Sequence, residues 1–170
     1  MFRRVIGRNQ VALTTDSDLV FFTDVDHCFG WGCLDELEVI WNDLKRAGPL
    51  PVMVWPHEVL VQASFDDADC FWNQSLEMKG VLHIPPYHSF VATRYYRAIG
   101  GVQIVNGDFA RKYGYLNGHA KWQSPISPDK PFPSFRDDVK FRRFCEASGC
   151  CFSIPLKNLY RLRHTKVTYR

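Results

Sequence analysis

The stretch LVFFTDVD, residues 19–26, is the strongest indication of the fold in this sequence. Five apolar or small residues in a row are typical of a buried strand, and the two aspartates follow where the chain leaves the sheet. Two carboxylates in this position can converge on one cation, and oxygen ligands of this kind suit Mg²⁺ or Mn²⁺. A solvated acidic turn is the simpler alternative, because a D-x-D pattern by itself is weak. The strand directly before the motif favours a binding role for Asp24 and Asp26.

Strands and helices are expected to alternate on both sides of this motif. Apolar residues at helical spacing predict helices, and compact apolar runs between turn residues predict strands. The expected helices are 2–14, 34–45, 108–113 and 137–147, and the expected strands are 19–23, 51–55, 59–63, 101–105 and 150–154. Residues 66–79 are ambiguous, 114–134 form a long surface loop, and a basic tail follows Ile154. The alternation predicts one α/β domain over residues 1–170, with functional loops beyond the strand ends.

Composition excludes several classes of protein. A hydrophobic fraction of 46% and an aromatic fraction of 15% supply a real core, so a disordered tail protein is excluded. The formal charge of +3, from 21 basic and 18 acidic residues, is too mild to predict nucleic-acid binding. No apolar run approaches the roughly 20 residues needed to span a bilayer, and no charged-then-apolar leader opens the chain. We therefore expect no membrane span.

The six cysteines bear on the compartment. They contain no C-x-x-C pair of the kind that a zinc ribbon or a thioredoxin-like motif needs. Buried or free thiols in a reducing compartment are the simplest interpretation. We expect a soluble cytoplasmic protein.

Three further positions are candidates for chemistry. Gly100-Gly101 precedes an expected strand, where two glycines let a ligand approach the backbone or simply form a turn. Asp137-Asp138 opens an expected helix, where the carboxylates either cap that helix or supply a general base. His164 is a lone histidine ten residues beyond the last expected strand, and such residues are more often surface or packed ones.

Together these motifs resemble the catalytic half of the β-1,4-galactosyltransferases and their GT-A relatives. Five segments match in family order: Phe2-Arg3-Arg4, similar to Phe-Asn-Arg; Phe22 to Asp26, similar to Phe-Ser-Asp-Val-Asp; Ile99-Gly100-Gly101-Val102, similar to an aromatic-Gly-Gly-Val donor loop; Arg136-Asp137-Asp138 with Phe141 to Phe144, similar to an acidic run and the helix it opens; and Arg161 to His164, similar to Met-Ile-Arg-His. The resemblance implies a GT-A-like mixed sheet flanked by helices.

The resemblance also implies a mechanism and a set of ligands. Asp26 and His164 would bind Mn²⁺ (or Mg²⁺), with Asp24 close to the metal or to the nucleotide ribose, and the metal would neutralise the diphosphate of a UDP-sugar donor. Asp137 would take the proton from a hydroxyl of the saccharide acceptor, which gives inversion, and Asp138 would orient the acceptor. The donor-binding positions would be Arg3, Asp24, Ala98, Gly100 and Gly101.

The chain departs from the family pattern in three ways. The family's N-terminal βαβ units, which hold the uracil, are missing before Arg3. Three alternatives follow: the uracil binds differently, another chain supplies its binding site, or activity is lost. The Trp-Gly-Trp-Gly-Gly-Glu segment is also missing, and Trp122 or Phe135 would be the acceptor-stacking aromatic if neither simply packs. Ala98 stands where galactose-specific members carry a tyrosine, which leaves room for the N-acetyl group of UDP-GalNAc or UDP-GlcNAc.

Two rival functions stay open. A strand followed by D-x-D also fits phosphatases of the haloacid dehalogenase type, but those carry Gly-Thr after the second aspartate where this chain has His27-Cys28. The other rival is a catalytically inactive GT-A remnant that binds a glycan or a protein. A homo-oligomer is possible under either transferase-like interpretation.

Overall fold

The computed structural model describes residues 4–63, 90–115 and 137–163, with side chains from residue 7 onward. The chain divides into two compact units. The first consists of Met1–Thr23, Gly48–Trp55 and Arg97–Phe152, and the second consists of Asp24–Ala47, Pro56–Tyr96 and Ser153–Arg170. Each unit is described by itself below.

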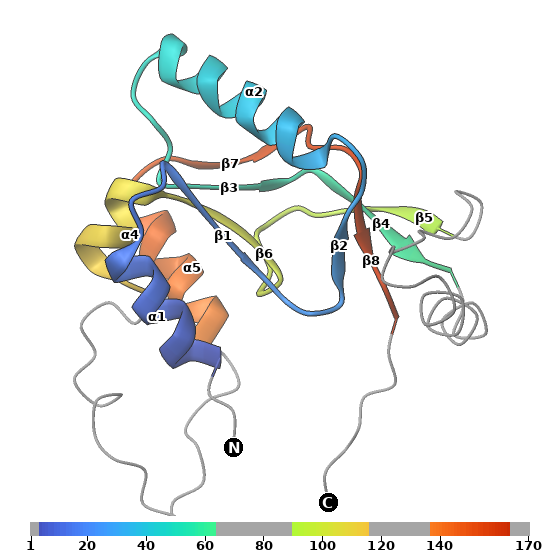
Figure 1. The fold of residues 1–170 in the computed structure, drawn as a ribbon, viewed down its shortest axis with the longest axis horizontal. Helices are drawn as coiled ribbons and strands as arrows, with labels where there is room; N and C mark the ends of the chain where they lie inside the picture. The colour runs from blue at the N-terminus through green and yellow to red at the C-terminus, as the bar shows by residue number, and fades with distance from the viewer. Residues whose placement is uncertain (1–3, 64–89, 116–136, 164–170) are drawn as a thin grey trace, which may run out of the picture. The chain divides into compact units, whose positions relative to one another are not determined.

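The first sheet contains most of the strands that the sequence predicts (Figure 1). Its order is β1 (Leu19–Thr23), β6 (Val102–Asn106), β3 (Met53–Pro56) and β7 (Cys151–Ile154). β6 runs antiparallel to both β1 and β3. Hydrogen bonds from Val52 N to Cys150 O and from His57 N to Ile154 O show that β3 and β7 run in the same direction. The sheet is therefore mixed, as expected of an α/β chain.

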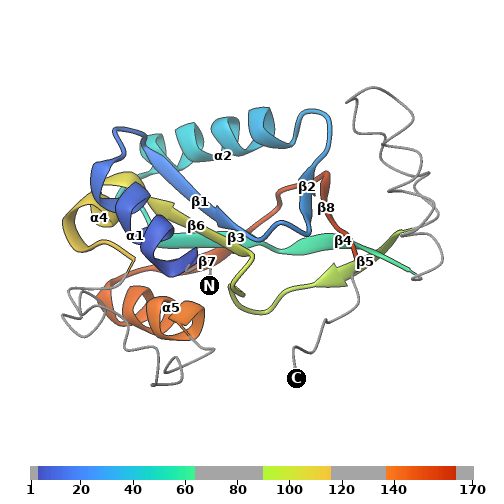
Figure 2. The ribbon, with the colours of Figure 1, turned by 60° about the horizontal axis from the view of Figure 1, so that its bottom comes forward.

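Three helices cover the face of this sheet that carries Phe22 and Gln103. They are α1 (Arg4–Thr14), α4 (Gly107–Tyr113) and α5 (Asp137–Ser148), and Figure 2 shows them gathered beside the sheet. The Phe22 ring meets Phe141 of α5 edge to face at 5.7 Å between centroids. Gln103, which is fully buried, donates its Nε2 to the carbonyl of Asp138 at 2.9 Å. These contacts fix the N-terminal half of α5 over β1 and β6.

The second unit contains a second sheet, of order β2 (His27–Phe29), β8 (Leu159–Arg161), β4 (Glu58–Gln62) and β5 (Phe90–Arg94). β8 is antiparallel to β2 and parallel to β4, while β4 is antiparallel to β5. Leu60, Phe90 and Leu162 form a small apolar core on one face. The longest helix of this unit's described part is α2 (Cys33–Ala47), which buries Cys33, Leu37 and Trp41 at helical spacing.

The structure confirms the α/β class and corrects the prediction for the end of the chain. Leu159–Arg161, which the sequence places in a basic tail, is a strand paired on both sides. β2 and β5 were not predicted either. β2 and β8 have three residues each, too few to show a period, and their stability comes from their neighbours in the sheet. The expectations for residues 66–79, and most of those for 114–134, lie outside the described residues.

Two expectations from composition can be compared with the described residues. Five of the six cysteines fall in the described ranges, and all five are free thiols: Cys28, Cys33, Cys145, Cys150 and Cys151. Of the helices in the described part of the chain, none has both the length and the apolar character needed to cross a bilayer.

Candidate functional site

The acidic motif forms a tight turn between β1 and β2. His27 N donates to Asp24 O at 3.2 Å, and the side chain of Val25 at the tip is fully exposed. Asp26 is turned inward and is only 7% exposed. Its backbone carbonyl accepts a hydrogen bond from Leu162 N at 2.7 Å, which extends the pairing of β2 with β8. The turn therefore presents Asp24 and Asp26 in different surroundings.

Both carboxylate oxygens of Asp26 contact protein groups. His27 Nδ1 lies 2.9 Å from Oδ1, and Arg161 Nε donates to Oδ2 at 3.0 Å. Burial by itself raises the pKa of Asp26, but the hydrogen bonds and charges of His27 and Arg161 outweigh burial and hold the pKa well below its ordinary value. Burial lowers the pKa of Arg161, but the hydrogen bond and charge of Asp26 help to raise it, and the pKa lies above its usual value. Asp26 and Arg161 thus form an ion pair at neutral pH.

This ion pair bears on the expected metal site. A divalent cation on Asp26 would have to share the carboxylate with His27 and Arg161, because each oxygen already contacts one of them. Within residues 4–63, 90–115 and 137–163, no three His, Cys, Asp or Glu side chains gather in a way that could hold a metal ion. His164, the third expected ligand, lies outside the described residues, so the metal set of Asp24, Asp26 and His164 stays a prediction.

The first unit brings the glycine loop, Gly100-Gly101, close to Asp138 of the acidic pair Asp137-Asp138. A Cβ atom built on Gly100 would lie 2.8 Å from Asp138 Oδ2 and 3.1 Å from Asp138 Cβ and Cγ. The glycine therefore lets a side chain of α5 approach the backbone closely, a use that was not predicted from the sequence. Asp137 and Asp138 are both partly buried in the first turn of α5, where carboxylates complement the positive end of the helix dipole.

The loop before β6 is anchored to α5 by a second contact. Arg142, which is 8% exposed, donates its Nη1 to Ala98 O at 3.1 Å, and its Nε lies 3.3 Å from Glu146 Oε1. Ala98 is fully buried, with 0% of its surface exposed, so its methyl group faces protein in this arrangement. Gly101 is buried as well.

Within the first unit, a chain of hydrogen bonds joins β6 to α1 through Tyr115. Tyr115 OH donates to Gln103 Oε1 at 3.3 Å, and Arg8 Nη1 donates to Tyr115 OH at 3.1 Å. Arg8 Nη2 also donates to Thr23 O at 2.8 Å, one residue before the acidic turn. Helix α1, which the sequence associates with donor binding through Arg3, is thus tied to the end of β1 by Arg8.

The expected site residues fall into three groups. Ala98, Gly100, Gly101, Asp137 and Asp138 lie together in the first unit, and Asp24 and Asp26 lie in the second. Arg3, Trp122, Phe135 and His164 lie outside the described residues. Sequence reasoning missed the pairing of Asp26 with Arg161, which is 135 positions away, because no local pattern signals a contact set by strand register.

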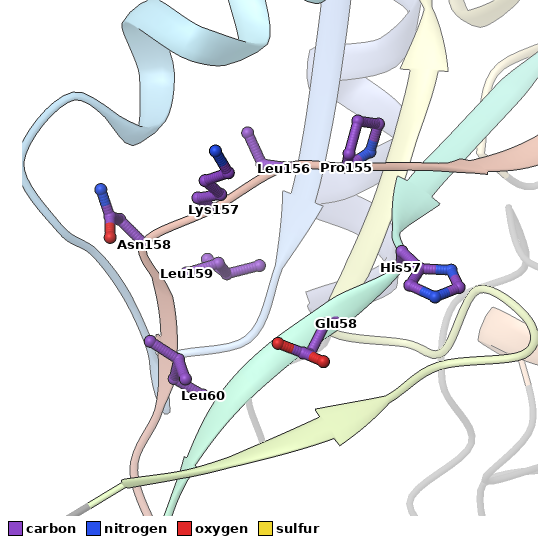
Figure 3. A pocket seen from close by; sticks show the side chains of 8 residues that line it. All are labelled: His57, Glu58, Leu60, Pro155, Leu156, Lys157, Asn158 and Leu159. Atoms are coloured by element: carbon purple, nitrogen blue, oxygen red, sulfur yellow. The ribbon is translucent and has the colours of Figure 1, made fainter. Parts of the chain in front are cut away.

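A pocket of about 380 Å³ opens in the second unit, and no pattern in the sequence predicts it (Figure 3). Its lining residues come from the start of β4 and from the connection between β7 and β8: His57, Glu58, Leu60, Pro155, Leu156, Lys157, Asn158 and Leu159. Its size is in the range of small-molecule sites.

Comparison of the chain with protein-family models, with curated proteins and with solved structures finds no match. The resemblance to glycosyltransferases therefore stays a prediction from the five sequence segments.

Proposed function

We propose that this chain is a metal-dependent inverting glycosyltransferase with a GT-A-like fold, transferring a hexose or N-acetylhexosamine from a UDP-sugar to a saccharide hydroxyl. The observation that carries the proposal is the contact of Gly100 with Asp138. These residues belong to two motifs that are 38 positions apart in sequence, and the family resemblance assigns both to one site.

Asp137 is the proposed general base. It lies beside Asp138 in the first turn of α5, and the Asp138 side chain closely approaches Gly100. A carboxylate here can accept the proton of an acceptor hydroxyl as that oxygen attacks the anomeric carbon, while the neighbouring carboxylate accepts a hydrogen bond from the acceptor sugar.

Asp24, Asp26 and His164 are the proposed ligands of the Mn²⁺ or Mg²⁺ ion, which when bound would neutralise the charge of the diphosphate leaving group. Arg161, which donates to Asp26 Oδ2, would share that carboxylate with the ion. Ala98, Gly100 and Gly101 are the proposed donor-side loop, together with Arg3.

The second candidate function is an inactive GT-A remnant that binds a glycan or a protein. The specific observation in its favour is the Asp26–Arg161 ion pair, because it gives the acidic turn a structural role that needs no metal. Under this alternative Asp26 stabilises the second sheet and the chain does not turn over a donor.

The test combines donor binding with one matched pair of variants. The full chain is assayed with Mn²⁺ and UDP-Gal, UDP-GalNAc or UDP-GlcNAc for binding by calorimetry and for UDP release. We expect Asp137→Asn to slow UDP release by about 10²- to 10⁴-fold, the usual effect of losing a positioned base, and to leave donor binding intact. The control Asp108→Asn removes an 87% exposed carboxylate from the first turn of α4 and should change neither quantity. A chain that neither binds nor hydrolyses any of these donors is not a transferase.

A further inference from the structure

β5 forms one edge of the second sheet, beside β4 (Figure 2). Among the strands that the structure describes, it pairs with β4 alone. An edge strand presents a row of backbone N–H and C=O groups on its outer side, and many proteins protect such an edge with lysine, proline or a bulge. The sequence of β5, Phe-Val-Ala-Thr-Arg, contains neither lysine nor proline, and its register with β4 runs without a bulge. This edge is therefore suited to pairing with another strand.

One hydrogen bond shows which backbone groups of β5 point outward. Tyr95 N donates to His57 O at 2.8 Å, so these two residues form a hydrogen-bonded pair at the end of the β4–β5 ladder. In an antiparallel ladder such pairs alternate with pairs that do not bond, so Thr93 and Val91 also bond to β4. The residues whose N–H and C=O groups point to the outer edge are consequently Phe90, Ala92 and Arg94.

These outward backbone groups have no hydrogen-bond partner in the described part of the chain. Ala92 and Arg94 are exposed, so water can hydrate their outward groups in the single chain. The Arg94 side chain does not cover the edge as a lone charge, because its Nε donates to His57 Nε2 at 2.8 Å. A second strand can therefore replace water along this edge without breaking any described backbone bond.

We propose that β5 pairs antiparallel with β5 of a second copy of this chain, which joins the second sheets of the two copies into one continuous sheet. The outward residues are spaced symmetrically about Ala92. A two-fold axis beside Ala92 therefore pairs every outward N–H of one copy with an outward C=O of the other. This inference does not depend on transferase activity.

The side chains of β5 suit pairing with a second copy of itself. Ala92 lies opposite its own counterpart at the axis, where a small side chain avoids a clash. Val91, which is 57% exposed in the single chain, lies opposite Thr93 of the second copy, and β-branched residues pack well on neighbouring strands. Arg94, the only charged residue of β5, lies opposite Phe90 of the second copy. No two like charges face each other directly in this register.

The test measures the dimer dissociation constant of the full chain by analytical ultracentrifugation over a range of concentrations. A single pair of strands makes a small interface, so we expect association in the micromolar to millimolar range. Ala92→Pro removes an outward N–H and leaves the bonds to β4 in place. It should raise the dissociation constant by about tenfold or more, because both symmetry-related bonds at the axis are lost. Val91→Lys places a charge on the edge strand and should weaken the dimer by a similar factor.

The matched control is Val39→Lys. Val39 lies on α2 of the same unit and is 60% exposed, close to the exposed fraction of Val91, so this variant should leave the dissociation constant unchanged. Amide hydrogen exchange of the wild-type chain gives a second readout. The amides of Ala92 and Arg94 should exchange more slowly as the protein concentration rises, whereas those of Val91 and Thr93 should be protected at every concentration.

The proposal is overturned if the wild-type chain stays monomeric up to millimolar concentration, or if Val91→Lys weakens the dimer no more than Val39→Lys does. It is also overturned if the Ala92 and Arg94 amides are protected at every concentration, because another part of the same chain would then cover the edge. Should a thermal melt show that Ala92→Pro does not fold, Val91→Lys and the hydrogen exchange of the wild-type chain decide.

Discussion

Replacing Asp26 by asparagine tests whether the acidic turn is built around an ion pair. Asparagine keeps the shape of the side chain but removes its charge, and one of its two terminal groups becomes a donor. The contacts to His27 Nδ1 and Arg161 Nε therefore lose the negative charge of the carboxylate. The backbone hydrogen bond from Leu162 N to Asp26 O does not depend on the side chain and should survive.

The size of the effect follows from burial. A buried ion pair broken by removing one partner costs about 3–5 kcal/mol. The side chain of Asp26 is 8% exposed but that of Arg161 is 39% exposed, so water can take over part of the arginine's solvation. We expect the free energy of unfolding to fall by about 1.5–3 kcal/mol, the range for a hydrogen bond to a charged group.

The effect should depend on pH in one direction. The pKa of Asp26 is lower in the folded chain than in the unfolded chain, so folding favours the ionised carboxylate. This contribution is complete above the unfolded pKa of about 3.9 and is lost as the pH falls toward the folded pKa. The difference in stability between wild type and Asp26→Asn should therefore be largest near neutral pH and smaller at about pH 3.

Urea denaturation of both proteins at neutral and acidic pH measures the two quantities. Asp43→Asn is the control in the same unit, because Asp43 and its partner Arg46 are 62% and 77% exposed, and its effect should be below about 0.5 kcal/mol. The reasoning is refuted if Asp26→Asn is as stable as the control at neutral pH, or if its deficit is unchanged in acid.

Two further predictions concern stability and thiol chemistry. A Cβ atom on Gly107 would lie 1.9 Å from Ser17 O, so Gly107→Ala should lower the free energy of unfolding by about 3 kcal/mol or more in chemical denaturation. Gly7 in α1 has open space around it, so Gly7→Ala should be neutral or stabilising by up to about 1 kcal/mol. An equal loss for both would contradict the packing argument. Burial raises the pKa of Cys33 to about 11, whereas Cys150 is exposed. Iodoacetamide near pH 8 should therefore modify Cys150 much faster than Cys33, as measured by peptide mass spectrometry. Equal rates would show that α2 opens readily.

The elements that the sequence predicted share one property: each carries its own pattern. β1 is a compact run of apolar and small residues, and α2 repeats buried residues at helical spacing, so composition and period identify both. β2 and β8 have three residues each, too few for a period, and they exist because they pair with each other and with β4. The second sheet was therefore visible only through its strand Glu58–Gln62.

The same difference holds for the candidate site. That Asp24 and Asp26 follow a strand and that Asp137 and Asp138 open a helix can be predicted from the sequence, because both facts depend on neighbours along the chain. Which groups these carboxylates meet depends on long-range packing: Arg161 reaches Asp26 through the β2–β8 register, and Asp138 reaches Gly100 because α5 lies over the loop before β6. Local periodicity reflects short-range backbone geometry, whereas a side chain's partner is set by how distant segments pack, and that information is spread over the whole chain.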